Sequence, residues 1–317
     1  MASGFGADTT AEEVAEGVDL SGRTIVLTGG SAGLGVETAR VLASHGARIV
    51  SVVRDEAKGA AAADGIRAEV PGAEIELAVL DLSDLDSVRR GADDIAARFP
   101  KIDRLINNAG VMACPLSRTK EGFDLQLGTN HLGHFVLTAR LMENVLAGAP
   151  ARIVNLSSGG HRMSPMRFDD PKFEREEYSK FVAYGQAKTA NVLFSVALDR
   201  RYGDRGVRSV AVHPGAIHTE LGRHMTGDDF KSLMKGRPQA EPMKFKELGA
   251  GAATTVWAAT TPELADRGGV YCEDCGVAEP IAAPDASLGV MDWALDEAAA
   301  DRLWTLSEEW TGERFPA

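Results

Sequence analysis

Residues 24–35 read Thr24-Ile25-Val26-Leu27-Thr28-Gly29-Gly30-Ser31-Ala32-Gly33-Leu34-Gly35. The run begins with β-branched and apolar residues, which are typical of a short buried strand. Its glycines then open a segment with helical periodicity that extends to about Gly46. A glycine loop between a strand and a helix favours phosphate binding, because the first amides of the helix point toward the anion. The alternative is a glycine-rich turn without a ligand.

The alternation of strand and helix continues downstream. Buried strands are predicted at 47–53, 75–80, 104–106 and 151–156. Helices are predicted at 55–68 and from the capping residues 81–84 to about Phe99. Continuous apolar strands separated by helices indicate a parallel sheet covered on both faces. The sequence therefore predicts an α/β fold of the Rossmann type, a doubly wound parallel sheet.

The glycines have the spacing G-x-x-x-G-x-G, which differs from the common dinucleotide fingerprint G-x-G-x-x-G. Gly29 permits the tight turn. Gly33 and Gly35 let the backbone approach a pyrophosphate and let the helix pack closely on the sheet. We therefore expect a dinucleotide cofactor at this loop.

Composition narrows the class of protein. The 317 residues are 44% hydrophobic and 25% charged, which fits one large domain with a sizeable core. The formal charge of -12 argues against a nucleic-acid or anionic-membrane partner. The chain has three cysteines and an acidic N-terminus without the features of a signal peptide. It also lacks an apolar run of about 20 residues, so we expect a cytoplasmic protein.

Tyr184 and Lys188 stand four residues apart, so on a helix an ammonium can lie beside a phenol. Alone, this spacing is more typical of a solvated helix face. Its weight comes from the segments before it, which are the glycine loop, Asn107-Asn108-Ala109-Gly110, Asn130 and Ser157-Ser158. A carbonyl that accepts a hydride develops negative charge on oxygen, which requires a proton and fixed donors. The set indicates nicotinamide-dependent carbonyl and alcohol chemistry.

In these motifs the chain resembles the short-chain dehydrogenase/reductase family, in its single-domain branch. The resemblance extends from Leu20 to about Tyr271 and rests on residues 28–35, Asp81-Leu82, residues 107–110, Asn130, Ser158, Tyr184, Lys188 and Pro214-Gly215. Residues 130–135 and the long interval between Ser158 and Tyr184 are similar to the retinol-dehydrogenase-like subgroup. That interval implies an insertion at about 166–180, near the site.

The resemblance implies a catalytic set of Asn130, Ser158, Tyr184 and Lys188. Tyr184 is expected to give or remove the proton, and Ser158 to donate to the carbonyl oxygen. Lys188 is expected to lower the pKa of Tyr184 and to bond the nicotinamide ribose, while Asn130 holds a helix kink and a water. Lowering a tyrosine pKa from about 10 to about 7 requires about 4 kcal/mol, to which Lys188 and a positive nicotinamide contribute.

Alternatives to some of these residues remain open. Ser157 is the alternative to Ser158, although relatives direct the second serine of such a pair at the substrate. Tyr178 is a weaker alternative acid because no lysine follows it at four residues. His161, three residues past Ser158, could touch the substrate.

The cofactor is predicted from the end of the second strand. Val53 stands where NAD-dependent relatives carry an acid, and Arg54 follows it. A guanidinium can pair with a 2′-phosphate bidentately, which contributes about 1.5–3 kcal/mol. We therefore predict NADP(H). The alternative is a surface arginine paired with Asp55 or Glu56, and the glycine loop offers Ser31 but no basic residue.

The resemblance implies the remaining cofactor contacts. They fall on Gly29, Ser31, Gly33, Leu34 and Gly35 in the loop, Asp81 and Leu82 at the adenine, Asn108, Ala109 and Gly110 at the adenosine ribose, and Pro214, Gly215, Ile217 and Thr219 at the nicotinamide carboxamide.

We expect an N-terminal extension over 1–20 with a capped helix at 9–17, a catalytic domain over 21–290, and a C-terminal helical extension over 291–317 with an amphipathic helix at 293–310. A substrate lid is expected over about 216–246, where His224, Met225, Phe230, Leu233, Met234 and Met243 suit a bulky apolar substrate. An ordinary surface helix is the alternative there. Relatives pair the long helices, here 121–146 and 184–202, into homodimers or homotetramers, unless the C-terminal extension covers them.

Other cysteines and histidines give weak signals. Cys272 and Cys275 have C-x-x-C spacing without a second pair, so we expect reduced thiols and no zinc. His213, His218 and His224 share no ligand spacing, so no metal is expected. His131 and His134 are expected to pack or cap.

The sequence therefore predicts an NADP(H)-dependent alcohol dehydrogenase or carbonyl reductase that acts on a small apolar ketone, aldehyde or secondary alcohol. One alternative is a cofactor-binding regulator without turnover, which would be expected to lack one of the four catalytic residues. The other is a reductase of carbon–carbon double bonds on the same fold.

Overall fold

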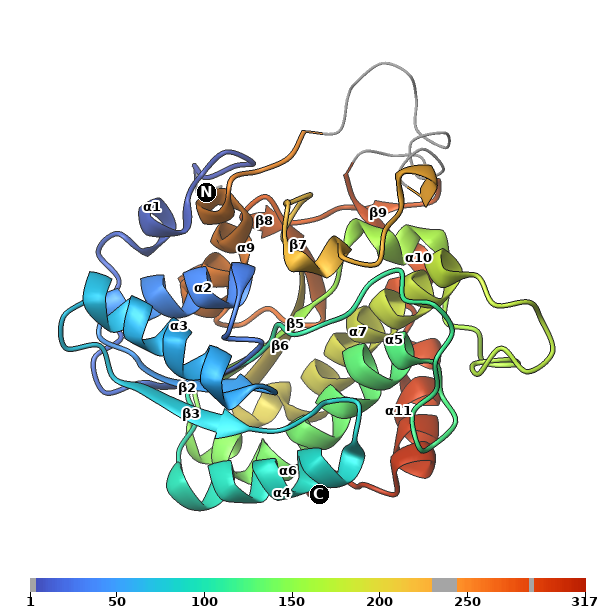
Figure 1. The fold of residues 1–317 in the computed structure, drawn as a ribbon, viewed down its shortest axis with the longest axis horizontal. Coiled ribbons are helices and arrows are strands. Elements are labelled where there is room, and N and C mark those ends of the chain that lie inside the picture. Colours follow the sequence, from blue (N-terminus) through green and yellow to red (C-terminus); the bar gives the residue numbers. More distant parts are fainter. Residues whose placement is uncertain (1–3, 230–243, 285–287) are drawn as a thin grey trace.

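A computed structural model describes residues 4–229, 244–284 and 288–317, and an eight-stranded sheet lies at its centre (Figure 1). The strands lie in the order β3-β2-β1-β4-β5-β6-β7-β8, and all neighbours are parallel except β7 and β8. Their bounds are β1 Thr24–Thr28, β2 Arg48–Val53, β3 Ile75–Val79, β4 Arg104–Asn107, β5 Ala151–Leu156, β6 Val207–His213, β7 Val270–Glu273 and β8 Gly276–Val277. The doubly wound sheet is confirmed, and its order changes direction between β1 and β4, where open α/β sheets bind ligands.

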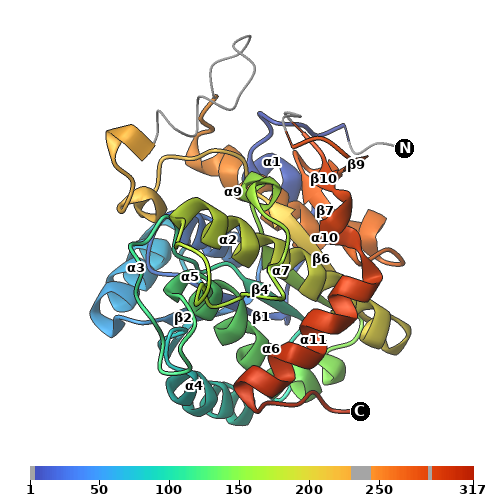
Figure 2. The same ribbon diagram turned by 90° about the vertical axis from the view of Figure 1, so that its right-hand side faces the viewer.

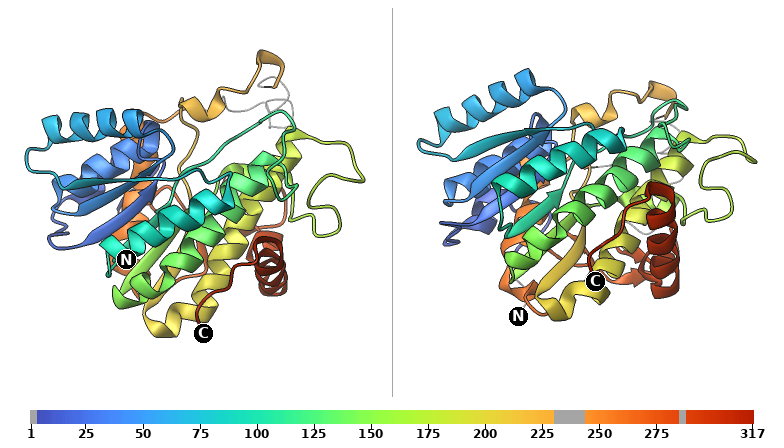
Figure 3. Two further views of the ribbon diagram at one scale, coloured as in Figure 1. Left: turned by 60° about the horizontal axis from the view of Figure 1, so that its bottom comes forward. Right: turned by 90° about the horizontal axis from the view of Figure 1, so that it is seen from below.

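Both faces of the sheet are covered by helices. Successive side chains of a strand point to opposite faces, so one strand contributes to two apolar clusters. On β1, Ile25 and Leu27 belong to one apolar cluster, whereas Val26 belongs to another. The first cluster is completed by α1 Ala11–Ala15, α2 Gly33–Ser44, α3 Glu56–Glu69 and α9 Leu248–Thr260. The second is completed by α4 Leu85–Arg98, α6 Gly133–Ala147, α7 Lys180–Tyr202 and α11 Glu297–Thr311. Figure 3 shows these two helical layers on either side of the strands.

The helix expected over 121–146 is interrupted. It begins as α5 Leu125–Leu127, widens into a π-helical turn at Gly128–Leu132, and continues as α6. Such turns are frequent at functional sites, and this one contains Asn130. The expected kink at Asn130 therefore takes the form of a π-helical turn.

The helix expected over 293–310 is also divided. α10 Asp292–Leu295 ends before Asp296, whose side chain accepts from Ala299 N and caps α11. Figure 2 shows α11 crossing over the helical layer that contains α7, so the extension covers a flank of one of the long helices expected to pair. Phe315 follows α11 and packs against Phe135 of α6 and Trp304 of α11, with ring centroids 5.1 and 4.3 Å apart.

The N-terminal helix is capped as expected, because Thr10 and Glu13 form a reciprocal capping box at α1. Other short elements in the described ranges are the 3₁₀ turns η2 Gly159–Met163, η3 Gly203–Arg205, η4 Glu220–Gly222 and η5 Pro262–Leu264, and the strand pair β9 Pro280–Ile281 and β10 Val290–Met291. Of the expected lid, residues 230–243, with Phe230, Leu233, Met234 and Met243, lie outside the described residues.

Candidate active site

The glycine loop lies between β1 and α2, as predicted. Gly29 has φ +78°, and a Cβ there would stand 3.1 Å from the Cα of Ala109. A Cβ on Gly35 would stand 2.1 Å from the carbonyl oxygen of Gly29, so only glycine fits. Ala32 at the N-cap of α2 provides no side-chain acceptor for the first amides of the helix. The backbone of the loop can therefore approach a pyrophosphate closely, and the first amides of α2 can donate to it.

The loop is tied to the end of β4. Asn108 Nδ2 donates to Thr28 O over 2.8 Å, and Ala109 N donates to Thr28 Oγ1 over 2.9 Å. His134 lies behind Thr28, with Nε2 2.9 Å from Thr28 Oγ1 and Nδ1 2.9 Å from Asn130 O. Because a carbonyl oxygen only accepts, Nδ1 carries the proton and Nε2 accepts from the hydroxyl. Burial lowers the pKa of His134 to about 4, which keeps this arrangement neutral.

Asn130 and Lys188 lie near Gly110. Both amide atoms of Asn130 bond Val111, with Oδ1 2.8 Å from Val111 N and Nδ2 2.9 Å from Val111 O. A Cβ on Gly110 would lie 3.1 Å from Asn130 Oδ1 and 3.7 Å from Lys188 Nζ. Lys188 is buried and donates to Leu156 O over 2.9 Å. Burial lowers its pKa to about 8. The structure thus brings these two predicted residues together at the ends of β4 and β5.

Tyr184 and Lys188 share a face of α7, with Lys188 Nζ 5.7 Å from the centroid of the Tyr184 ring. Burial raises the pKa of Tyr184 to about 12, opposed by a hydrogen bond with Ser158. The pKa of Tyr184 is thus raised, whereas Lys188 was expected to lower it. The reason is that the phenol is 3% exposed and the nearby ammonium is directed to a backbone carbonyl. The protein alone therefore keeps Tyr184 protonated at neutral pH.

The two serines after β5 differ in what they contact. Ser157 is buried, and its hydroxyl donates to Lys188 O over 2.8 Å. Ser158 instead bonds Tyr184, and its Oγ accepts from Gly160 N over 3.0 Å. The geometry favours Ser158 over its rival, because only its hydroxyl meets the phenol. Tyr178 does not share this environment, since its hydroxyl donates to Cys114 O over 3.0 Å.

The adenosine side of the predicted site lies at the ends of β2 and β3. Arg54 follows β2 and is exposed, and within the described ranges it forms no ion pair. The carboxylate of Asp55 accepts from Lys58 N at the start of α3, and the alternative surface pair of Arg54 with Asp55 is not seen among the described residues. Asp81 Oδ1 accepts from Ser83 N and Ser83 Oγ, and Leu82 is buried beside it.

The segment expected at the carboxamide returns to the glycine loop. The methyl carbon of Thr219 lies 3.5 Å from the position of a Cβ on Gly33. Ile217 and Leu34 both lie within 3 Å of a Cβ placed on Gly251, so both side chains pack against this glycine of α9. Gly215 follows Pro214 with φ +95° and packs against the Lys246 side chain. Ser31 is half-buried in the loop itself.

The described ends of the expected lid are both anchored. Ile217 forms a β-bridge with Lys246, and the rings of His218 and Phe245 stack with centroids 3.8 Å apart. Lys180, at the start of α7, pairs with Asp229 over 2.5 Å. Asp229 is therefore linked to the helix that carries Tyr184.

The side chain of His161, named above as one that could touch the substrate, is bonded to backbone groups through both ring nitrogens. It is fully buried, with Nδ1 2.8 Å from Ser158 O and Met291 N 3.1 Å from Nε2. Sequence reasoning missed this contact because nothing local links residue 161 to residue 291. The signal that could have found it is an apolar strand-like segment just before the C-terminal helix.

The remaining weak signals have structural explanations. Cys272 and Cys275 are buried and form no disulfide, and burial raises the pKa values of their thiols to about 12 and about 11. Across the described parts of the chain, no group of three or more potential ligands could hold a metal ion. His131 is buried against Phe194 and bonds Ser307 Oγ over 2.8 Å, so it packs as expected.

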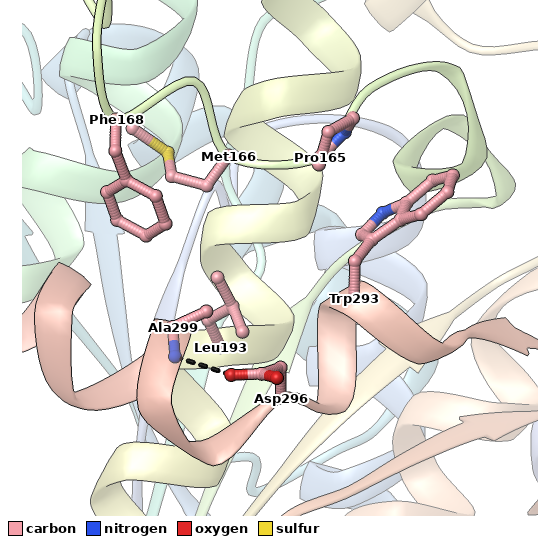
Figure 4. A pocket seen from close by; sticks show the side chains of 7 residues that line it. All are labelled: Pro165, Met166, Phe168, Leu193, Trp293, Asp296 and Ala299. Atoms are coloured by element: carbon pink, nitrogen blue, oxygen red, sulfur yellow. Dashed lines mark hydrogen bonds between the residues drawn. The ribbon is translucent and has the colours of Figure 1, made fainter.

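An apolar cavity of about 290 Å³ lies apart from this cluster, between the predicted insertion and the C-terminal helices (Figure 4). It is lined by Pro165, Met166, Phe168, Leu193, Trp293, Asp296 and Ala299. In the portions of the chain that are described, no helix has the length and apolarity to cross a membrane.

Comparison with known proteins agrees with this geometry. The sequence profile of the short chain dehydrogenase family matches residues 23–229. Retinol dehydrogenase 12 of Homo sapiens is 40% identical over 298 residues, which is 94% of this chain and 89% of that protein. The short-chain dehydrogenase/reductase prx1 of Penicillium roqueforti is 38% identical, over 91% of this chain and 85% of that protein. The crystal structure of an uncharacterized protein from Mycobacterium paratuberculosis superposes with a TM-score of 0.73 and 35% identity, over 96% of this chain and 98% of the other. The chain therefore belongs to the short-chain dehydrogenase/reductase family, in its retinol-dehydrogenase-like subgroup, and is an oxidoreductase with a nicotinamide cofactor.

Proposed function

We propose that this enzyme transfers a hydride between NADP(H) and the carbonyl or alcohol of a small apolar substrate, with Tyr184 as general acid and base. The observation that carries the proposal is the meeting of the Ser158 and Tyr184 hydroxyls on the side of α7 that also holds Lys188. The nicotinamide supplies the hydride acceptor or donor when bound. The chain supplies the proton and the donors that orient the substrate oxygen.

The protonation states suit reduction of a carbonyl. Burial keeps the proton on Tyr184, whose pKa is raised to about 12, so the phenol is an acid in place at neutral pH. The hydroxyl of Ser158 accepts from Gly160 N, which leaves its own proton for a neighbouring oxygen. In the oxidising direction, the positive charge of the nicotinamide and the Lys188 ammonium would lower the pKa of the phenol.

The cofactor residues follow from the same positions. Gly29, Gly33 and Gly35 would hold the pyrophosphate with Ser31 and Leu34 at its sides, and Lys188 would bond the nicotinamide ribose. Arg54 would pair with the 2′-phosphate, which favours NADP(H) over NAD(H). The other contacts would be Asp81, Leu82, Asn108, Ala109, Gly110, Pro214, Gly215, Ile217 and Thr219.

An apolar substrate is supported by the surroundings of the phenol. The methyl group of Met163 and the ring of Tyr184 both approach Gly160, so an apolar side chain lies near the phenol ring. The names of the retinol dehydrogenases that this chain resembles refer to an apolar alcohol.

The proposal extends to the organisation of the chain. Residues 21–290 would form the catalytic unit, with 1–20 and 291–317 as extensions. Three buried free thiols are compatible with a reducing, cytoplasmic compartment.

The test is NADPH consumption over a panel of steroid, retinoid, aromatic and aliphatic carbonyls, repeated with NADH. We expect turnover of apolar ketones or aldehydes to the alcohol, identified by product analysis. A product with a reduced carbon–carbon bond would replace the proposed reaction with the alternative one. Tight NADPH binding without turnover of any carbonyl would indicate the regulator.

A further inference from the structure

His161 lies at the junction of three segments around the candidate active site. Its ring is fully buried, 4.8 Å from the ring of Tyr271 on β7. Thr189, the residue after Lys188, donates to His161 O over 3.1 Å. The histidine therefore contacts the catalytic helix through its backbone and the C-terminal part of the chain through its side chain.

The ring of His161 has one defined tautomer. Ser158 O only accepts, so Nδ1 donates to it over 2.8 Å. Met291 N–H only donates, so Nε2 accepts from it over 3.1 Å. The backbone amide of His161 also donates to Ser158 O, over 3.0 Å. A neutral imidazole thus joins Ser158 to strand β10.

β10 is itself held rigidly at this place. Gly289 N donates to Glu273 Oε1 over 2.5 Å, and Arg162 Nη2 donates to Gly289 O over 2.8 Å. Val290 N donates to Glu279 O over 3.0 Å, beside the pairing of β10 with β9. Met291 N–H is consequently directed at His161 and not at the neighbouring strand.

This contact bears on the geometry of Ser158. The Ser158 hydroxyl is oriented by Gly160 N, within a turn whose closing bonds both come from His161. If the ring rotates, the turn loses one of its two bonds to Ser158 O, and the hydroxyl moves relative to Tyr184. A displacement of about 1 Å in a catalytic group can cost about 100-fold in rate.

We propose that His161 is a positioning residue that holds Ser158 against Tyr184, and that β10 completes the positioning by fixing the imidazole through the Met291 amide. The inference rests on the proposed carbonyl and alcohol chemistry. It gives the C-terminal segment a role in the catalytic step that no sequence motif indicates.

The first test substitutes the ring. His161→Phe keeps an aromatic ring and removes both side-chain bonds, and we expect kcat to fall about 10- to 100-fold with KM and NADPH affinity little changed. In His161→Asn the amide nitrogen stands close to the place of Nδ1, and in His161→Gln the amide oxygen reaches the place of Nε2. We expect Asn to recover most of the lost kcat and Gln to recover little.

The second test removes only the donor from β10. Met291 has φ -65°, which suits proline, and Val290 before it is in a strand, so Met291→Pro deletes the N–H without backbone strain. Met291→Ala loses the same side chain but keeps the N–H. We expect Met291→Pro to lower kcat below that of Met291→Ala while both bind NADPH equally.

The outcomes separate this inference from the proposed function. Absence of carbonyl turnover by the unsubstituted enzyme contradicts the proposed function. Turnover by the unsubstituted enzyme that His161→Phe retains within twofold, with the variant folded by melting temperature, overturns the positioning role. Equal recovery by Asn and Gln overturns it as well, because a merely structural ring would not distinguish the two bonds.

Discussion

Arg54 offers a test of how the cofactor is chosen. It stands directly after β2, exposed, while Asp55 is engaged at the N-terminus of α3. No described carboxylate pairs with the guanidinium, so an incoming 2′-phosphate would meet an uncompensated positive charge. We expect Arg54→Asp to reverse the preference between NADPH and NADH.

The size of the effect follows from the charges. Two unit charges 4 Å apart in water interact by about 1 kcal/mol, and a phosphate monoester carries about -1.5 to -2 at pH 7. Changing Arg to Asp alters the facing charge by two units, which gives about 3–4 kcal/mol. Salt at physiological strength, with a Debye length of about 8 Å, reduces this to about 1.8–2.4 kcal/mol. The ratio of NADPH to NADH affinity should therefore fall about 20- to 60-fold.

The assay is a fluorescence titration of both reduced cofactors with three variants. Arg54→Gln removes the charge without reversing it and should give an intermediate ratio. Arg48→Asp is the matched control, because Arg48 is an exposed arginine at the opposite end of β2, paired with Glu74. It makes the same change in net charge and should leave the ratio unaltered.

Two results would refute the reasoning. One is an unsubstituted enzyme that binds NADH as tightly as NADPH. The other is an Arg54→Asp ratio that matches the Arg48→Asp ratio. The NADPH affinity of the unsubstituted enzyme should also weaken more steeply with salt than that of Arg54→Gln, since only the unsubstituted enzyme can pair a guanidinium with the 2′-phosphate.

Three further outcomes are expected. Tyr184→Phe should lower kcat at least about 100-fold, the lower range for general acid catalysis, while NADPH affinity measured by titration stays within twofold. The buried His131, His134 and His161 have pKa values lowered to about 3, 4 and 4, so below pH 6.5 the unfolded chain takes up protons that the folded chain does not. In urea unfolding, the free energy of unfolding should therefore fall by about 4 kcal/mol as the pH is lowered from about 6 to about 5. In His131→Gln this fall should be smaller by about 1.4 kcal/mol per pH unit. An unchanged slope in that variant would contradict a neutral, buried His131. Phe315→Ala should reduce the free energy of unfolding by about 2 kcal/mol, since the ring is partly buried among aromatic side chains, and an unaltered urea midpoint would show that the tail is not docked.

The sequence was most informative where local pattern and position coincide. β1 begins at Thr24 and α2 at Gly33, within a residue or two of the prediction, because an apolar run followed by glycines admits few other structures. Tyr184 and Lys188 share a face because helical spacing alone determines it.

Other features depended on contacts that span the chain. The π-helical turn at Gly128–Leu132 could be anticipated as a kink but not as an extra residue in the turn. The raised pKa of Tyr184 reflects burial by segments that no motif contains. The tautomer of His161 depends on Met291, and no local pattern near residue 161 predicts a contact with residue 291.

The aromatic ring of Phe315 and the whole of α11 cover the flank of α6 and α7 from within the same polypeptide. A surface completed by a covalently attached segment has an effective partner concentration that dilution cannot lower. Whatever rigidity this cover gives to the helix beneath Tyr184 is thus present in nanomolar assays as fully as in concentrated samples.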